Sequence, residues 1–117
     1  LTAEEVASLD LSGCAWAVLS SCHSGIGEYY PHEGLLGLRR AFAVAGAGTL
    51  IASLWAVGDE ATLAWMPELY RGRLERGEST ADAGRPPSLP VLASRREAGR
   101  SMHPFYWAAF VAVGDPR

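Results

Sequence analysis

The residue of this sequence best suited to chemistry is Cys22, which lies in the run Leu19-Ser20-Ser21-Cys22-His23-Ser24-Gly25. A cysteine thiolate is a strong nucleophile that can attack the carbonyl carbon of a peptide bond. The apolar residues before it, bounded by Gly13, predict a buried strand. In α/β sheets, reactive groups gather beyond the carboxyl ends of the strands. This position favours a nucleophile, and the alternative is a small buried thiol.

A nucleophilic cysteine needs a base, and the histidines of this chain are poorly placed to supply one. His23 is adjacent to Cys22, but neighbouring residues of an extended segment point to opposite sides. We expect His32 in a loop and His103 at the entry to a strand. No combination of these histidines with the cysteines has the spacing of a zinc site, so neither a metal nor another cofactor is predicted.

The glycines after Cys22 have two interpretations. A turn that needs a positive φ would account for Gly25 and Gly27. Alternatively, backbone N–H groups beside the thiol hold the oxyanion of a tetrahedral intermediate. The second interpretation makes Gly25 a candidate oxyanion-hole residue.

The elements that would position Cys22 alternate between helices and strands. Runs that are apolar on both faces predict strands buried between helix layers, and apolar residues at helical spacing predict helices. The predicted helices are Leu1–Leu9, Glu33–Ala45, a helix from Asp59 to Gly77, and Val91–Ala98; the predicted strands are Cys14–Ser20, Thr49–Trp55 and Phe105–Val113. This order predicts an α/β fold with a parallel or mixed sheet covered by helices.

Local signals refine these bounds. Thr2 and Glu5 form the pattern of a capping box, and Asp59 is a natural N-cap. Pro67 should kink its helix because it removes a backbone hydrogen bond. Three further prolines between Ser79 and Arg100 forbid a continuous helix there.

Composition limits the classes of function. The 117 residues suit one domain or part of one, and the net charge of −3 argues against nucleic acid as the main partner. No run reaches the roughly 18 apolar residues that cross a membrane. Cys14 and Cys22 lie at opposite ends of one predicted strand, about 26 Å apart, so two free thiols and a reducing cytoplasm are expected. Because the chain begins at Leu1, we expect it to be part of a longer protein.

Several short runs, taken together, resemble the C-terminal part of a CHAT domain, a caspase-like family related to separase. They occur in the order and spacing of that family across about Leu1–Asp115. The runs are Leu19–Cys22, Gly34–Leu38, Arg40–Phe42, Ala45–Ala47, Ser53–Thr62, His103–Pro104 and Tyr106–Phe110.

The resemblance implies a caspase–haemoglobinase-like three-layer sandwich with a mainly parallel sheet, of which residues 1–117 form the C-terminal portion. It also implies a cysteine–histidine dyad that hydrolyses peptide bonds, with Cys22 as the nucleophile. In the family the histidine lies upstream in a His-Gly motif, so we expect the base to precede this chain. The expected setting is bacterial signalling or defence, and the isolated 117 residues should be inactive.

The resemblance also suggests where a substrate binds. In separase-like relatives, the loop matching Trp55–Asp59 borders the pocket for a basic side chain. Asp59 could bind that side chain, because a carboxylate binds arginine with two hydrogen bonds, or it could act only as an N-cap. Trp55 could form a wall of the same pocket or simply pack in the core.

Two features depart from the family, and a non-catalytic alternative stays open. His23 occupies a position that is commonly acidic or amide-bearing, and Gly84–Pro90 interrupts a helix that is normally continuous.

The expected partners are a peptide or protein substrate, the upstream half of the domain, and a helical-repeat (TPR-like) sensor region. The alternative is an inactive caspase-like scaffold. Arg39, Arg40 and the run Arg95–Glu97 are interpreted as solvated helix faces.

Overall fold

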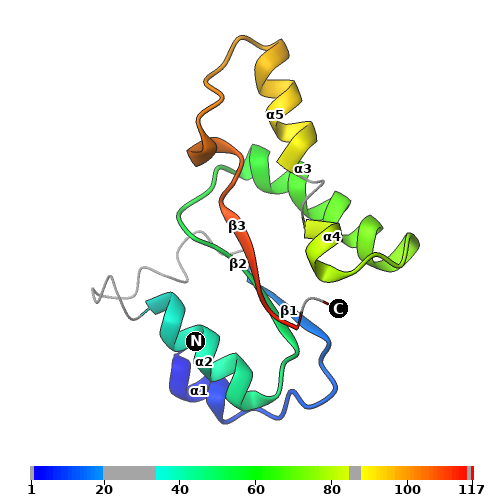
Figure 1. Cartoon of the computed structure of the whole chain (residues 1–117). Helices are drawn as coiled ribbons and strands as arrows, with labels where there is room; N and C mark the ends of the chain where they lie inside the picture. Colours follow the sequence, from blue (N-terminus) through cyan, green and yellow to red (C-terminus); the bar gives the residue numbers. More distant parts are fainter. Residues whose placement is uncertain (1, 20–33, 85–87, 116) are drawn as a thin grey trace.

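A computed structural model of the chain describes residues 2–19, 34–84, 88–115 and 117 (Figure 1). Helices and strands follow one another in the predicted order, with several helical elements between the second and third strands. They are α1 (Ala3–Ala7), β1 (Trp16–Leu19), α2 (Gly34–Ala45), β2 (Thr49–Ser53), α3 (Asp59–Tyr70), the π-helix η1 (Arg71–Glu75), α4 (Thr80–Gly84), α5 (Ser88–Glu97), the 3-10 helix η2 (Pro104–Tyr106) and β3 (Phe110–Gly114).

The described strands form one mixed sheet in the order β1-β2-β3. β1 pairs with β2 in parallel, and Leu19 lies opposite Ala52. β2 pairs with β3 in antiparallel fashion, and Ser53 lies opposite Phe110. The described sheet is therefore mixed, which is one of the two forms that the element order predicted, and one of its two pairings is parallel. The segment that includes α5 and η2 lies at the end of the sheet where β2 ends (Figure 1). Strand β3 therefore starts at that end and runs antiparallel to β2.

Strand β2 is the centre of the fold because its side chains alternate between two apolar clusters. Leu50 and Ala52 join a cluster built mainly from α1 and α2. Ile51 joins a second cluster with residues of α3 and α4. The first four residues of β2 are buried, whereas all four residues of β1 are only partly buried.

The first helix begins as its capping pattern predicts. The Thr2 hydroxyl accepts a hydrogen bond from the Glu5 backbone N–H (3.2 Å), and the Glu5 carboxylate accepts one from the Thr2 N–H (2.8 Å). These two bonds satisfy donors that a helix start leaves open. Helix α1 packs against α2, and Val6 is fully buried between them.

Helix α3 differs from its prediction at both ends. Gly58 is its N-cap, and no side chain caps it, so Asp59 is the first helical residue and the predicted N-cap role was wrong. Pro67 does not end the helix, which continues to Tyr70 and then widens into η1. Gly77, with a φ of +64°, lies just beyond that segment.

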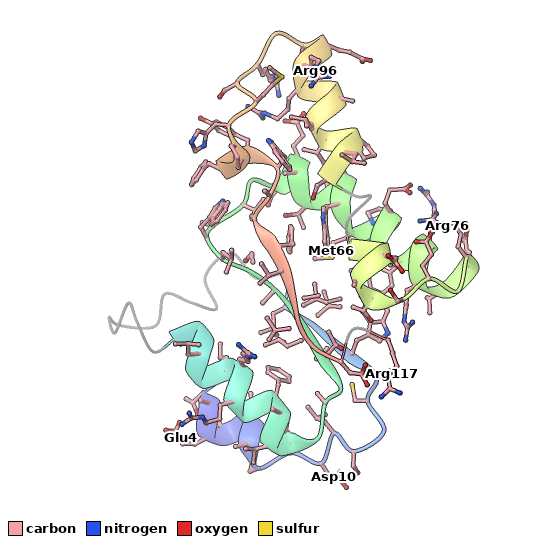
Figure 2. All side chains as sticks on the ribbon, viewed as in Figure 1. Glu4, Asp10, Met66, Arg76, Arg96 and Arg117 are labelled. Carbon is pink, nitrogen blue, oxygen red and sulfur yellow. The ribbon has the colours of Figure 1, made fainter. Side chains whose placement is uncertain are left out.

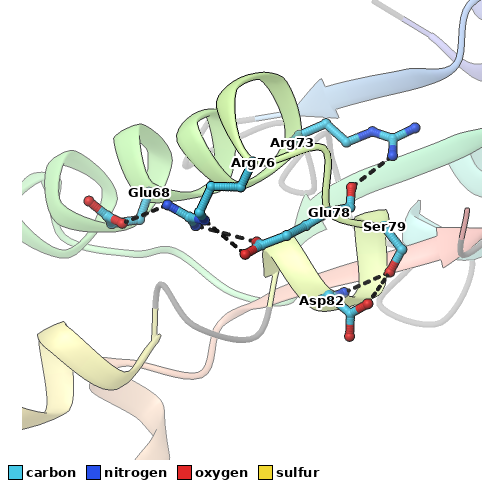
Figure 3. Close-up of polar contacts among 6 residues, drawn as sticks. All are labelled: Glu68, Arg73, Arg76, Glu78, Ser79 and Asp82. Atoms are coloured by element: carbon cyan, nitrogen blue, oxygen red, sulfur yellow. Dashed lines mark hydrogen bonds and ion pairs between the residues drawn. The ribbon is translucent and has the colours of Figure 1, made fainter.

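Polar contacts close the turn between η1 and α4 (Figure 3). Arg76 donates two hydrogen bonds to the Glu78 carboxylate, at 2.8 and 3.3 Å, and these bonds raise the pKa of the arginine. Arg73 donates to the backbone carbonyl of Glu78 at 2.9 Å. Ser79 then caps α4 by accepting from the Asp82 N–H at 3.1 Å.

The last strand is shorter than predicted, and α5 is longer. Residues 104–106 form η2 instead of a strand, because Pro104 starts that turn and the ring of His103 caps it. The strand then covers Phe110–Gly114. Helix α5 begins at Ser88, upstream of the predicted start; Pro90 is tolerated because N–H groups in a first helical turn have no intrahelical partner.

Candidate functional site

The candidate site lies at the edge of the sheet where β1 and β2 both end. The two strands are parallel, so their carboxyl ends meet at one edge, with Leu19 beside Ala52. The predicted nucleophile Cys22 and the predicted oxyanion residue Gly25 follow β1 and lie outside the described residues. The structure therefore describes the strand that precedes Cys22 in the sequence and the segment that follows β2.

Trp55 follows β2 at this edge, and its partner comes from far along the chain. Its indole N–H donates a hydrogen bond to the carbonyl of Phe105 at 2.8 Å. The two rings stack with centroids 5.7 Å apart and planes 7° from parallel. Because Trp55 is only partly buried and stacks on Phe105, it forms part of an aromatic cluster at the end of the sheet and not of the central core.

Asp59 opens α3 beyond the same edge with an exposed side chain. The carboxylate of the neighbouring Glu60 forms an ion pair with Arg100, whose guanidinium lies 3.1 Å away. Within the described part of the chain, the Asp59 carboxylate makes no ion pair or side-chain hydrogen bond. The Trp55 indole N–H donates to Phe105 and not to Asp59. The structure places both residues on the segment after β2, and Asp59 is available to a cation.

His103 is the one histidine that the described ranges include, and it has a structural task. Its Nδ1 accepts a hydrogen bond from the Phe105 backbone N–H at 3.2 Å, which caps η2. His23 and His32 lie outside the described residues. The expectation of His103 at a strand entry was wrong, because η2 and three further residues separate it from β3.

Sequence reasoning missed a group of half-exposed side chains beside Trp55. The Phe105 and Tyr106 rings meet edge to face at 5.3 Å. The Arg95 guanidinium lies 4.1 Å from the centre of the Tyr106 ring, a cation–π contact. Arg95 is thus only partly a solvated residue. The signal in the sequence was a His-Pro pair followed directly by two aromatic residues.

Three other kinds of site are relevant to the described residues: a cavity, a metal centre and a membrane span. An apolar cavity of about 250 Å³ lies between β2, β3, α3 and α4, lined by Ile51, Trp65, Leu69, Thr80, Ala81, Gly84, Phe110 and Ala112. Among the described residues, no group of three or more histidine, cysteine or acidic side chains could hold a metal ion. None of the helices in those ranges is long and apolar enough to cross a membrane.

Comparison with known proteins gives one family. A model of the CHAT domain family matches residues 1–115. Tetratricopeptide repeat protein 28 from mouse is 32% identical over 115 residues, which is 98% of this chain and 4% of the mouse protein. Its human counterpart is 30% identical over 83 residues, 71% of this chain and 3% of that protein. No solved structure gives a significant match.

Proposed function

Because this chain belongs to the CHAT domain family, we propose that it carries the nucleophile of a cysteine peptidase, and that Cys22 is that nucleophile. The Cys22 thiolate attacks the carbonyl carbon of a peptide bond, and backbone N–H groups near Gly25 hold the oxyanion. The intermediate collapses and the C–N bond breaks. The leaving amine takes its proton from a histidine, and water then hydrolyses the thioester. We assign that histidine to a segment outside this chain.

The parallel pairing of β1 with β2 is the observation that carries this proposal. Leu19 lies opposite Ala52, so the chain leaves both strands at the same edge of the sheet. Cys22 follows Leu19 by three residues, which span at most about 11 Å of extended chain. Trp55 follows Ala52 by the same number. The thiol and the segment Trp55–Asp59 are therefore tethered to neighbouring strand ends.

Asp59 is proposed to select a basic residue before the scissile bond. Its carboxylate is exposed and unpaired among the described residues, unlike that of Glu60, which binds Arg100. An arginine side chain could then bind it with two hydrogen bonds. Trp55, stacked on Phe105, offers a flat wall for the aliphatic part of that side chain.

The remaining partners are proposed from the family and from the relatives. β1 has only one described neighbour, β2, so the upstream half of the domain could extend the sheet into a caspase–haemoglobinase-like three-layer sandwich. The chain spans 4% of the mouse relative, which is named a tetratricopeptide repeat protein. We propose that helical repeats act as the sensor. A cytoplasmic location fits the free thiol of Cys14, and a bacterial signalling role stays a prediction.

The test compares Cys22→Ala with Cys14→Ala in the full-length parent protein. An arginyl fluorogenic peptide and an electrophilic arginyl probe report hydrolysis and thiol labelling. Cys22→Ala should lower kcat/KM at least about a thousandfold and abolish labelling. Cys14 is a free, partly buried thiol two residues before β1, so its replacement should change both readouts less than about threefold. Equal activity of the two variants would remove Cys22 from the mechanism.

The second candidate function is a non-catalytic interaction domain. The exposed aromatic and arginine side chains around η2 favour it, because such residues are enriched in protein interfaces. This candidate predicts that Cys22→Ala leaves the function of the parent protein intact. The absence of an upstream His-Gly motif in the full-length sequence would favour it further.

A further inference from the structure

A compact group of side chains, four of them exposed and Arg95 half-buried, lies beyond the end of β2, and we call it the aromatic–arginine patch. It consists of Arg95, Arg96, Met102, Phe105 and Tyr106. The three large apolar members are 49%, 50% and 43% exposed, respectively. Figure 2 shows Arg96 on α5 at the top of the view, far from Asp10 at the opposite end of the molecule. Tyrosine, phenylalanine, methionine and arginine are the residues enriched in the buried centres of protein interfaces.

The patch is held in shape without being buried. The Met102 backbone carbonyl accepts a hydrogen bond from the Trp107 indole N–H at 2.8 Å. Phe105 is held by the Trp55 contact on one side and by the His103 cap on the other. Side chains that are ordered before binding lose little conformational entropy on binding. This order suits a docking surface.

Two arginines of the patch lack a carboxylate partner within the described ranges. Arg95 donates to the Ser101 carbonyl at 2.7 Å and lies over the Tyr106 ring. The Arg96 guanidinium contacts the sulfur of Met102 at 3.4 Å. In contrast, Arg100 is paired with Glu60. Residues 95–100 hold three arginines and one glutamate, whereas the whole chain has a net charge of −3.

We propose that the aromatic–arginine patch binds an acidic peptide segment that also carries aromatic or aliphatic side chains. The exposed rings and Met102 would contact the apolar side chains, and Arg95 and Arg96 would bind the carboxylates. A peptide fits better than a nucleic acid, because the overall charge is negative and a phosphate backbone needs a wider basic surface. This inference does not depend on the proposed peptidase function.

Binding can be measured on the full-length protein carrying Cys22→Ala, so that no bound peptide is cleaved. The probe is a fluorescein-labelled peptide of twelve residues that alternates glutamate with phenylalanine and leucine, followed by fluorescence anisotropy. The paired change Arg95→Glu and Arg96→Glu should weaken binding at least tenfold. The matched control, Arg39→Glu with Arg40→Glu, changes two exposed arginines of α2 and should alter binding less than twofold.

Further probes separate charge, apolar contact and the class of partner. A peptide with lysine in place of glutamate, and one with serine in place of the apolar residues, should each bind at least tenfold more weakly. The single change Arg96→Glu should weaken binding at least threefold even if the paired change unfolds the domain, because the Arg96 side chain is exposed and its hydrogen bond goes to the Met102 sulfur. The proposal is overturned if the labelled peptide does not bind, if the control pair loses as much, or if a twelve-nucleotide oligothymidylate binds more tightly.

Discussion

The two ends of strand β2 are built for different purposes. At its start, Gly48 and Thr49 are joined to the end of β3 by backbone and buried side-chain contacts: the Asp115 N–H donates to the Gly48 carbonyl at 2.9 Å, and the Thr49 hydroxyl donates to the Asp115 carbonyl. At its end, Trp55 leads to half-exposed rings and to an unpaired carboxylate at Asp59. The start of β2 is therefore a closed end, tied to the end of β3, and its finish is an open end, where side chains are exposed.

The difference between the ends predicts that stability depends on one end of β2 and that function depends on the other. Thr49 is 3% exposed, whereas Phe105 is 50% exposed. Substitutions at the first end should act on folding, and substitutions at the second end should act on binding or catalysis. The predictions below test this separation, beginning with the largest expected effect.

The largest effect is expected for Gly114→Ala at the closed end. Gly114 has a φ of +134°, and a Cβ there would overlap the Gly48 carbonyl and lie 2.9 Å from the Thr49 Cα. Backbone strain and overlap together should lower the free energy of unfolding by about 3 to 5 kcal/mol. Denaturant titration of the domain measures the change.

Gly37→Ala provides the matched control of opposite sign. A Cβ at Gly37 meets nothing within 4 Å, and the residue lies inside α2. Alanine should stabilise that helix by about 0.5 to 1 kcal/mol. If Gly114→Ala were as harmless as this control, the closed end would not be the rigid part of the sheet.

The next effect is expected at the open end, for Asp59→Asn in the full-length protein. Loss of the carboxylate should lower kcat/KM for an arginyl peptide by about tenfold, because asparagine cannot pair with the guanidinium charge. The melting temperature should move little, since Asp59 makes no side-chain hydrogen bond or ion pair with the described residues. Glu60→Gln, which disrupts only the exposed pair with Arg100, serves as the control.

A smaller contrast compares one hydrogen bond from each end of β2. Thr49→Val keeps the side-chain shape but leaves the Asp115 carbonyl without its hydroxyl donor, at a cost of about 1 kcal/mol of stability. Trp55→Phe removes the indole N–H but keeps an aromatic ring on Phe105, in a partly exposed place. It should cost less stability and weaken peptide binding instead. Equal losses of stability in both variants would contradict the comparison.

The smallest effect is expected at the exposed pair that follows β3. Hydrogen bonds from Arg117 lower the pKa of Asp115 from 3.8 to about 2. Since the folded pKa is depressed, this pair favours the folded state above about pH 4, and the contribution disappears as the pH falls through 2. Carboxyl chemical shifts should give this midpoint, and Arg117→Ala should return it toward 3.8. An unchanged midpoint would show that the pair does not form in solution.

Local sequence signals predicted the elements close to the sheet core. The strand beginning at Thr49 and the helix ending at Ala45 were found because their apolar patterns are strong and glycines bound them. The antiparallel direction of β3 was missed, because it depends on where the preceding segment lies in space. The aromatic cluster was missed for the same reason, since Trp55 and Phe105 are 50 residues apart. Cys22 and Gly25 stay predictions from the sequence.

By itself, the sequence determined membership of the CHAT domain family, the alternation of helices and strands, and the identity of the candidate nucleophile. These depend on residue types and short spacings, which the chain carries whatever its folded shape. Only the tertiary structure decided that β1 and β2 end side by side, that β3 runs back along β2, and that Trp55 meets Phe105. Such contacts join distant residues, and their geometry is set by packing of the whole domain.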